Sequence, residues 1–296
     1  MLQGKVVKAS GGFFTVLEQD GGEYFCRARG MLKQDEKGLM VGDWVLFEPV
    51  KNSSGGSNNE GVVEKLLPRK NFLPRPPVAN VDQLMVVMSL KQPECDWQLV
   101  SRMLALAEKE GLSAIVCLNK IDLLLKEELD ELPFEPGPFP YKMIYTSAVN
   151  NSGLDDIKEC LSGQCSVLAG PSGVGKSTLL NAIQPGLALQ TGPVSDKIKR
   201  GKHTTRQVTL IPLETGGIVA DTPGFTRLNF FEIEAEDLAD YFPEFDDLRG
   251  QCAFRDCLHI NEPKCAVYRE VGNSINPLRY EHYKQFVKEL NKQEAF

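Results

Sequence analysis

The first 68 residues alternate short apolar runs with Gly-Gly and polar turn segments, a pattern typical of β-strands. Strands are predicted over residues 5–9, 13–17, 23–27, 43–47 and 61–67. Five short strands in so short a segment favour a small Greek-key barrel, and the OB-fold is the commonest five-stranded form. We therefore predict an OB-like β-barrel over residues 1–68 and a stiff, proline-rich linker over residues 69–77.

The pattern changes at residue 78, where buried apolar runs begin to alternate with apolar positions at helical spacing. Strands are predicted over residues 83–88, 114–118, 141–146, 165–169 and 218–220. Helices are predicted over residues 97–110, 154–161 and 177–184. Because strands that alternate with helices form mainly parallel sheets, residues 78–230 are predicted to form an α/β domain.

The remaining segment, residues 231–296, has few apolar runs and little core of its own. Asn276 and Pro277 have the N-cap and first-turn positions of a helix that is predicted to run through Leu290. The chain has 296 residues, which is enough for two or three domains with separate cores.

Composition narrows the possible classes of protein. A net charge of −7 argues against indiscriminate nucleic-acid binding, although it allows a local basic face. The N-terminus has no apolar run suited to a signal peptide, and no apolar stretch is long enough to span a bilayer. We expect a cytoplasmic protein that is monomeric and binds no membrane. Five of the eight cysteines are scattered, and in that compartment disulfides are not expected.

A glycine-rich loop follows the strand predicted over residues 165–169. Gly170, Gly175, Lys176 and Ser177 match the P-loop spacing G-x-x-x-x-G-K-[ST]. Such a loop turns backbone N–H groups toward phosphate oxygens, and the helix N-terminus favours negative charge. Lys176 is expected to bridge the β- and γ-phosphates during catalysis, and Ser177 to ligate Mg²⁺. The predicted nucleotide-binding residues of this loop are Gly170, Pro171, Ser172, Gly173, Val174, Gly175, Lys176, Ser177 and Thr178.

A second motif identifies the base. Asn119, Lys120 and Asp122 form the sequence N-K-x-D at the end of a predicted strand and are predicted to bind the nucleotide. Asn119 is expected to bond the other edge of the base and to tie the strand to the loop, while the Lys120 stem packs along the purine. A carboxylate at Asp122 accepts hydrogen bonds from N1–H and the exocyclic amine of guanine, a donor pair that adenine lacks. Ser147 and Ala148, after the strand predicted over residues 141–146, resemble the short signature whose backbone N–H contacts the guanine carbonyl.

A third motif, D-x-x-G, starts at Asp221 and ends at Gly224. Its aspartate is expected to hold Mg²⁺ through water, and its glycine N–H to sense the γ-phosphate. GTPases usually carry the P-loop first and N-K-x-D later, whereas here N-K-x-D and Ser-Ala precede the P-loop. Because the cyclic order is unchanged, we predict a circularly permuted GTPase, which chain termini close together in space make tolerable.

None of these motifs supplies a residue that positions the attacking water. Phe225 stands where many GTPases have glutamine, and a phenyl ring cannot orient water. His203 is the polar candidate, since a neutral imidazole orients or accepts from water near pH 7. Thr205 is predicted to ligate Mg²⁺, with Thr204 as its competitor.

The segment around these residues carries an excess of positive charge, from Lys197, Lys199, Arg200, Lys202 and Arg206. It is either a solvated loop, in which His203 has no catalytic role, or a contact with RNA phosphates that orders the loop for catalysis.

Near the C-terminus four soft metal ligands fall within fourteen residues, at Cys252, Cys257, His259 and Cys265. Cys₃His is a standard set for a structural Zn²⁺, and a metal suits a segment with little core. The alternative, redox-active or merely buried thiols, is disfavoured because no C-x-x-C pair is present.

The predicted barrel also offers side chains suited to RNA. Aromatic and basic residues occur together at Phe13, Phe14, Tyr24, Phe25 and Trp44, with Arg27, Arg29 and Lys33 nearby. OB-folds bind single strands through exposed aromatic and basic side chains. The alternative is that most of these rings fill the barrel interior.

An OB-like barrel, a permuted GTPase with G-P-S-G-V-G-K-S and a Cys₃His tail together resemble the RsgA family, the ribosome small-subunit-dependent GTPases of bacteria. The resemblance covers the whole chain. It implies binding to the 30S subunit and hydrolysis of GTP to GDP and phosphate during late maturation. It also implies 16S rRNA contacts by the flanking domains, rRNA-stimulated turnover, and a match between His203 and the family's catalytic candidate.

Two other functions stay open at this stage. One is a GTP-hydrolysing enzyme or GTP-dependent switch acting on another RNA, such as tRNA. The other is a GTP-dependent binding module whose hydrolysis is incidental.

Overall fold

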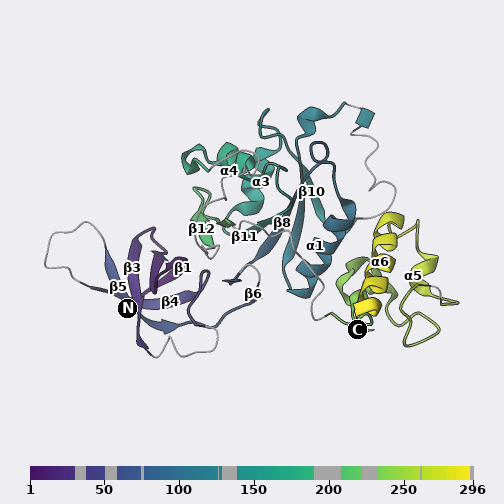
Figure 1. Cartoon of the computed structure of the whole chain (residues 1–296), viewed down its shortest axis with the longest axis horizontal. Helices are drawn as coiled ribbons and strands as arrows, with labels where there is room; N and C mark the ends of the chain where they lie inside the picture. Colours follow the sequence, from purple (N-terminus) through teal and green to yellow (C-terminus); the bar gives the residue numbers. More distant parts are fainter. Residues whose placement is uncertain are drawn as a thin grey trace.

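The structure is a computed structural model. It describes residues 1–30, 38–50, 59–74, 77–125, 127–128, 139–189, 208–221, 233–260 and 262–293. Several predicted functional residues lie outside these ranges: Lys33, the basic segment 197–206 with His203, Thr204 and Thr205, and also Gly224 and Phe225. A β-barrel and a small helical segment lie on opposite sides of a central α/β domain (Figure 1).

The N-terminal strands close into a barrel, as predicted. They are β1 Leu2–Ser10, β2 Phe13–Glu18, β3 Glu23–Ala28, β4 Trp44–Val50 and β5 Glu60–Leu66. Their order is β1-β2-β3-β5-β4, and β4 pairs back onto β1. Branched and aromatic side chains on the inward face of each strand fill the interior, namely Val6, Val16, Val45, Phe47 and Val63, together with Cys26.

The barrel aromatics divide between the two predicted roles. Phe14 and Tyr24 are half-buried and pack against the barrel core, which agrees with the alternative that the rings fill the barrel interior. Phe25 is 47% exposed and its ring stacks on Phe13 with the ring centroids 4.8 Å apart. The Arg27 guanidinium lies 4.7 Å from the Phe13 centroid. These three side chains therefore form an aromatic and basic surface on β2 and β3.

The α/β domain contributes six strands to the sheet, in the order β10-β9-β8-β11-β13-β12. The strands are β8 Gln83–Ser89, β9 Ser113–Asn119, β10 Lys142–Tyr145, β11 Cys165–Ala169, β12 Thr209–Pro212 and β13 Ile218–Asp221. All neighbours pair in parallel except β12, which is antiparallel to β13. Every residue of the central β8 is buried, because helices cover both faces of a parallel sheet.

Three helices provide that cover: α1 Trp97–Lys109, α3 Leu154–Leu161 and α4 Lys176–Ile183. Apolar positions of α1 pack on one face of the sheet, and those of α3 and α4 on the other. The predicted strands and helices are confirmed apart from shifts at their ends. We had not predicted β12, because its four residues show no clear alternation. It joins the barrel to the sheet through the pair Lys8↔Thr209.

The predicted linker contains secondary structure as well. Residues Phe72–Pro74 (β6) and Pro77–Ala79 (β7) pair antiparallel, with Leu73 opposite Val78. Leu73 and Val78 are buried in the same core as the α/β domain. Asn80, at φ +54°, follows the hairpin and donates from Nδ2 to the Gly42 carbonyl of the barrel at 2.9 Å. Two short strands therefore occur within and just after the predicted linker, and burial of Leu73 and Val78 stabilises them.

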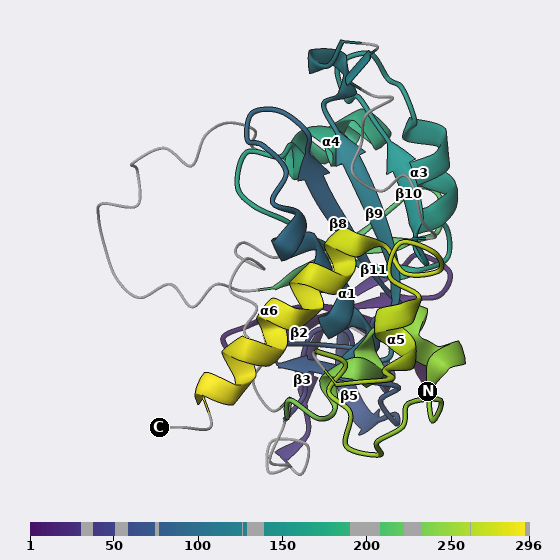
Figure 2. The same ribbon diagram turned by 90° about the vertical axis from the view of Figure 1, so that its right-hand side faces the viewer.

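The C-terminal segment is built from short 3-10 turns and one long helix. Its elements are η4 Leu238–Tyr241, η5 Pro243–Leu248, α5 Ala266–Arg269 and α6 Pro277–Gln293. Asn276 caps α6 as predicted, because its Oδ1 accepts from the N–H of Leu278 at 2.9 Å and of Arg279 at 3.2 Å. The helix runs beside α1 (Figure 2), where Arg102 pairs with Glu289 and Ser101 bonds His282.

A buried arginine forms an ion pair within this segment and also contacts α1. The Arg279 side chain is 1% exposed, and its Nε donates to Glu244, which is 4% exposed, at 2.8 Å. Its Nη1 also donates to the Ser101 carbonyl of α1 at 3.3 Å, and the guanidinium lies 4.4 Å from the Phe242 centroid.

Within the part of the chain that the structure describes, none of the helices has the length and apolar character needed to span a bilayer.

We predict that Arg279→Ala lowers the free energy of unfolding by about 3–5 kcal/mol, because the Glu244 carboxylate is left buried without its cation. Urea denaturation of the full chain, followed by circular dichroism, measures the loss. Arg249→Ala is the matched control. Arg249 is likewise an arginine in ion pairs, here with Asp240 and Asp246, but its side chain is 48% exposed. It should cost at most about 1 kcal/mol, and equal losses in the two variants would contradict the prediction.

Candidate nucleotide site and metal centre

The predicted nucleotide motifs meet at the carboxyl edge of the parallel sheet. Asn119 ends β9 and residues 120–122 follow it, residues 147–148 follow β10, residues 170–178 follow β11, and Asp221 ends β13. These strands lie on the two sides of β8, so segments far apart in the sequence converge. The crevice outside the carboxyl ends of an open α/β sheet is where ligands bind.

The loop after β11 has a backbone that only glycine allows at two positions. Gly170 has φ +144°, and a Cβ atom there would lie 2.0 Å from the Val87 carbonyl oxygen. Gly175 has φ +98°, and its Cβ would lie 2.4 Å from Nδ2 of Asn119. The loop can therefore approach β8 and β9 closely, and α4 begins directly after it at Lys176.

The Lys176 side chain folds back over this loop. Its Nζ donates to the carbonyls of Gly170 at 2.7 Å and Pro171 at 2.8 Å. Burial lowers the pKa of the ammonium below its ordinary value. An ammonium held only by carbonyl oxygens is suited to meet phosphate oxygens. Ser177 and Thr178 follow in the first turn of α4, so the Ser177 hydroxyl belongs to the same helix end.

Asn119 ties the phosphate loop to the base-reading strand. Its side chain is buried, and Nδ2 donates to the Val174 carbonyl at 2.9 Å. Its Oδ1 accepts from the Thr146 hydroxyl at 3.1 Å. Each end of the amide thus has one protein partner, and one N–H and one lone pair remain for a ligand. The contact with Val174 links the phosphate loop to the strand that carries the N-K-x-D motif, and the predicted contact of Asn119 with the base stays a prediction.

Lys120 and Asp122 are held by the same surroundings. Lys120 has φ +64°, and its Nζ donates to the Gly173 carbonyl at 2.6 Å and also to the Gln92 carbonyl. The exposed Asp122 accepts through Oδ1 from the buried Ser147 hydroxyl at 2.6 Å. The Ser147 Oγ in turn accepts from the Asn150 N–H at 3.1 Å. One carboxylate oxygen of Asp122 is thereby oriented.

The predicted hydrolytic and Mg²⁺ residues are only partly placed. The backbone of Asp221 ends β13, which is parallel to β11 with Val167 opposite Ala220, so Asp221 stands one strand away from the phosphate loop. Its side chain, and all of His203, Thr205 and Gly224, lie outside the described residues. The structure thus brings the base and phosphate residues together and leaves the hydrolytic residues as predictions.

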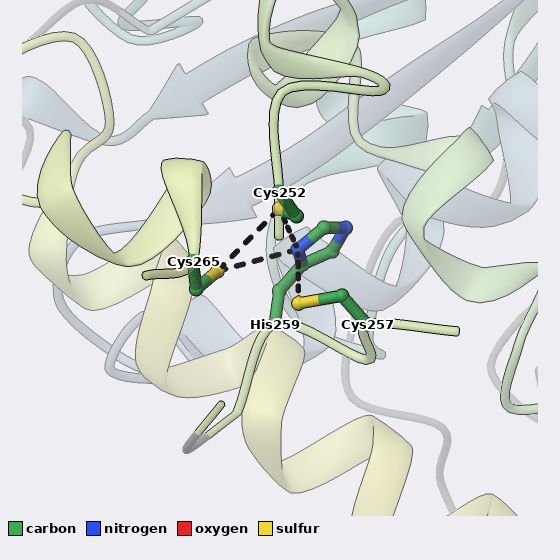
Figure 3. A group of neighbouring side chains, drawn as sticks. All are labelled: Cys252, Cys257, His259 and Cys265. Carbon is green, nitrogen blue, oxygen red and sulfur yellow. Dashed lines mark hydrogen bonds between the residues drawn. The ribbon is translucent and has the colours of Figure 1, made fainter. Parts of the chain in front are cut away.

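The four predicted metal ligands converge in the C-terminal segment (Figure 3). The Nδ1 atom of His259 lies 3.5 Å from Sγ of Cys252, 3.5 Å from Sγ of Cys257 and 3.4 Å from Sγ of Cys265. Cys252 and Cys265 are 4.0 Å apart, and all four donor atoms lie within 4.8 Å of one another. Four tetrahedral ligands at Zn–S and Zn–N bond lengths have edges of about 3.6–3.8 Å. The donor set therefore fits a tetrahedral metal ion.

The surroundings of this cluster also suit thiolate ligands. The Cys252 sulfur accepts from the Ala266 N–H at 3.3 Å, and the Cys265 sulfur from the Tyr268 N–H at 3.4 Å. Two tyrosines of α6 hold the loop that carries the histidine. Tyr280 donates to the His259 carbonyl at 2.8 Å, and Tyr283 donates to Leu258 at 2.8 Å. The cluster is thus fixed from its own loop and from α6.

Sequence reasoning missed two side chains that shape the nucleotide site. Thr146 orients Asn119, and the Ser147 hydroxyl orients Asp122, whereas the prediction gave the Ser-Ala signature only a backbone role. Their position was the available signal, because Thr146 is the last residue of a predicted strand and Ser147 comes directly after it. Their partners are 27 and 25 residues away in the sequence, so only the fold identifies them.

Comparison with known proteins agrees with the geometry. A family model described as RsgA GTPase matches residues 66–231, and one described as RsgA N-terminal domain matches residues 3–56. A protein of Moorella thermoacetica named "Small ribosomal subunit biogenesis GTPase RsgA" is 46% identical over 98% of this chain and 97% of its own length. A protein of the same name from Alkaliphilus metalliredigens is 42% identical over all of both chains.

Two solved structures share the fold. YjeQ from Thermotoga maritima has a TM-score of 0.80 and 37% identity, with 98% of each chain covered. YloQ, described as a circularly permuted GTPase, has a TM-score of 0.81 and 35% identity, covering 99% of this chain and 96% of the other. The predicted OB-like barrel and permuted motif order are confirmed, and the chain belongs to the RsgA family of GTPases, enzymes that hydrolyse GTP.

Proposed function

We propose that this GTPase acts in biogenesis of the small ribosomal subunit: it binds the 30S subunit, contacts 16S rRNA and hydrolyses GTP to GDP and phosphate late in maturation. The observation that carries the proposal is the match of the entire chain, flanking segments included, to proteins named for that process. In the proposed division, residues 1–68 and 231–296 contact rRNA, residues 69–77 connect, and residues 78–230 bind and hydrolyse GTP. We further propose that the protein is a cytoplasmic monomer.

The nucleotide site supports the GTP part of the proposal. Asp122 reads the N1–H and amine of guanine, held in place by Ser147, while a backbone N–H at Ser147 or Ala148 meets the guanine carbonyl. The N–H groups of residues 170–178 cradle the phosphates, and Lys176 exchanges its loop carbonyls for phosphate oxygens.

Mg²⁺ bound with GTP would neutralise charge on the phosphates, held by Ser177 and Thr205 and through water by Asp221. In this scheme His203 orients the attacking water, and the Gly224 N–H contacts the γ-phosphate. Phe225 cannot take the water-orienting role, which is why we assign it to His203.

The flanking segments support the RNA part. The Phe13, Phe25 and Arg27 surface of the barrel offers a stacking face with a cation beside it. We propose that the metal of the C-terminal cluster is one structural Zn²⁺, because three sulfurs and one imidazole nitrogen at tetrahedral spacing match its preferred ligands. All four positions are filled by protein, so the ion would have no open site for chemistry.

Base selection gives the first test. Asp122→Asn should weaken GTP binding by about 100-fold or more, because the amide carries no charge and its N–H₂ group faces the guanine amine, donor against donor. Xanthosine triphosphate should gain affinity, since the amide N–H₂ can donate to its 2-oxo group. Equilibrium titration with both nucleotides measures the change. Ser147→Ala, which keeps the carboxylate but frees its orientation, should weaken GTP binding by only a few-fold; wild-type affinity in Asp122→Asn would exclude the assigned role.

Turnover tests both the subunit and the catalytic histidine. GTP hydrolysis by the wild-type protein should rise on addition of purified 30S subunits, and the stimulation should fall with added salt, because phosphate contacts release counterions. His203→Ala should lower stimulated turnover by about 100-fold and leave GTP affinity unchanged.

Separate Thr204→Ala and Thr205→Ala variants show which threonine supports Mg²⁺-dependent binding. If purified 30S subunits do not raise the rate of GTP hydrolysis, that result would favour action on another RNA, such as tRNA. Full turnover in His203→Ala would remove the histidine from the mechanism.

Metal removal tests the C-terminal centre. We expect one zinc per chain by elemental analysis, and Cys257→Ser or a strong chelator should release it and expose the amides of residues 233–293 to hydrogen exchange, because the segment has a small core. Cys160→Ser is the control, because Cys160 lies in α3 away from the cluster. A chain that contains no zinc and keeps its exchange protection in chelator would contradict the assignment.

A further inference from the structure

A pocket of about 690 Å³ lies between the barrel and the α/β domain. Lys5 of β1 and Trp44 of β4 line it from the barrel, and Cys165 and Ile218, the first residues of β11 and β13, line it from the sheet. The nucleotide loops follow the opposite ends of these strands, so the pocket is a different site. Its volume is in the range of small-molecule sites.

The floor of the pocket carries a buried cation. Lys5 is only 4% exposed. Its Nζ donates to the Asn80 carbonyl at 3.2 Å and lies 5.4 Å from the Trp44 ring centroid. An ammonium has three N–H donors, and burying one without a counter-charge is costly. Among the residues that the structure describes, no carboxylate lies within ion-pair distance of this nitrogen.

The other charges that line the pocket are matched. Arg69 donates to the fully buried Asp43 at 2.7 Å and 2.9 Å, so the Asp43 carboxylate neutralises the charge of Arg69. Lys70 pairs with Asp82 at 3.2 Å near the surface, where Lys70 is 60% exposed. Asp82 also accepts from the Cys165 N–H at 2.8 Å, so both of its carboxylate oxygens have partners other than Lys5.

The Cys165 thiol does not supply the missing negative charge. Burial raises the pKa of this thiol above its ordinary value, although the neighbouring Lys5 ammonium acts in the opposite direction. The group is therefore neutral near pH 7. The pocket has one unmatched positive charge at its floor and apolar surface from Trp44 and Ile218 on its walls.

We propose that this pocket binds a small aromatic anion, of the chemical class of a nucleoside monophosphate, with its phosphate on Lys5 and its ring against Trp44. The near-complete burial of Lys5 suits a terminal phosphate, because a phosphodiester within an RNA chain needs room for a nucleotide on each side of it. Because the walls belong to both the barrel and the α/β domain, the bound anion holds the two together.

The test uses the full chain saturated with Mg²⁺ and GDP, so that the P-loop is occupied. The chain has two tryptophans, and Trp97→Phe leaves Trp44 as the fluorescent probe. AMP is the titrant, because Asp122 finds no donor pair on adenine. Adenosine and inorganic phosphate are titrated separately. We expect a saturating change in Trp44 emission with AMP, and weaker binding of each fragment.

In the same background Lys5→Met should weaken AMP binding by about tenfold or more, because a charge-assisted hydrogen bond is lost. Lys8→Met, which removes the same charge from an exposed position of β1 outside the pocket, is the matched control and should bind AMP normally. If Lys5→Met does not fold, Trp44→Phe followed by calorimetry replaces it, and it should also weaken binding. No saturation with AMP, adenosine binding as tight as AMP, or unchanged affinity in Lys5→Met would overturn the proposal.

Discussion

The hydrogen bond from the Asn119 amide to the Val174 carbonyl is the contact on which the nucleotide site depends. It joins residues 55 positions apart in the sequence, at a donor–acceptor distance of 2.9 Å. Gly175 makes that approach possible, because a side chain there would meet the same amide nitrogen. A guanine nucleotide must be held at its base and its phosphates at once, so the spacing between these two loops decides whether it fits. Thr146 orients Asn119 and thereby keeps the spacing fixed.

Permutation leaves this geometry intact, since the order of strands in the sheet does not depend on where the chain begins. The motif-bearing strands β9, β10, β11 and β13 are parallel, so their carboxyl ends stay at one edge. What permutation changes is the segment that follows β13, which here is the C-terminal part of the chain. That part is anchored on α1, where Ser101 receives contacts from both Arg279 and His282. Helix α1 thus packs on the sheet with one face and on the C-terminal segment with the other.

The contacts that the α/β domain makes with the barrel and with the C-terminal segment use polar groups in different ways. At α1, a buried arginine is neutralised by Glu244, and breaking such a pair is costly. At the barrel, Arg69 and Asp43 form a comparable pair, whereas Lys5 keeps a charge that no described carboxylate matches. A fully matched pair stabilises a joint, and an unmatched buried cation is the feature expected of a binding site. The C-terminal segment depends further on its four metal ligands, because its apolar core is small.

The sequence by itself determined the features that depend on local pattern. Alternating apolar residues predicted the barrel strands, strand–helix alternation predicted the parallel sheet, and fixed spacings predicted the P-loop, the N-K-x-D segment and the Cys₃His set. Only the tertiary structure decided which distant groups meet: Thr146 with Asn119, Ser147 with Asp122, and Arg279 with Glu244. It also decided that Phe25 is exposed and Lys5 buried. The reason is physical, because periodicity and motif spacing are set by neighbours along the chain, whereas burial and pairing of a side chain are set by segments that only folding brings together.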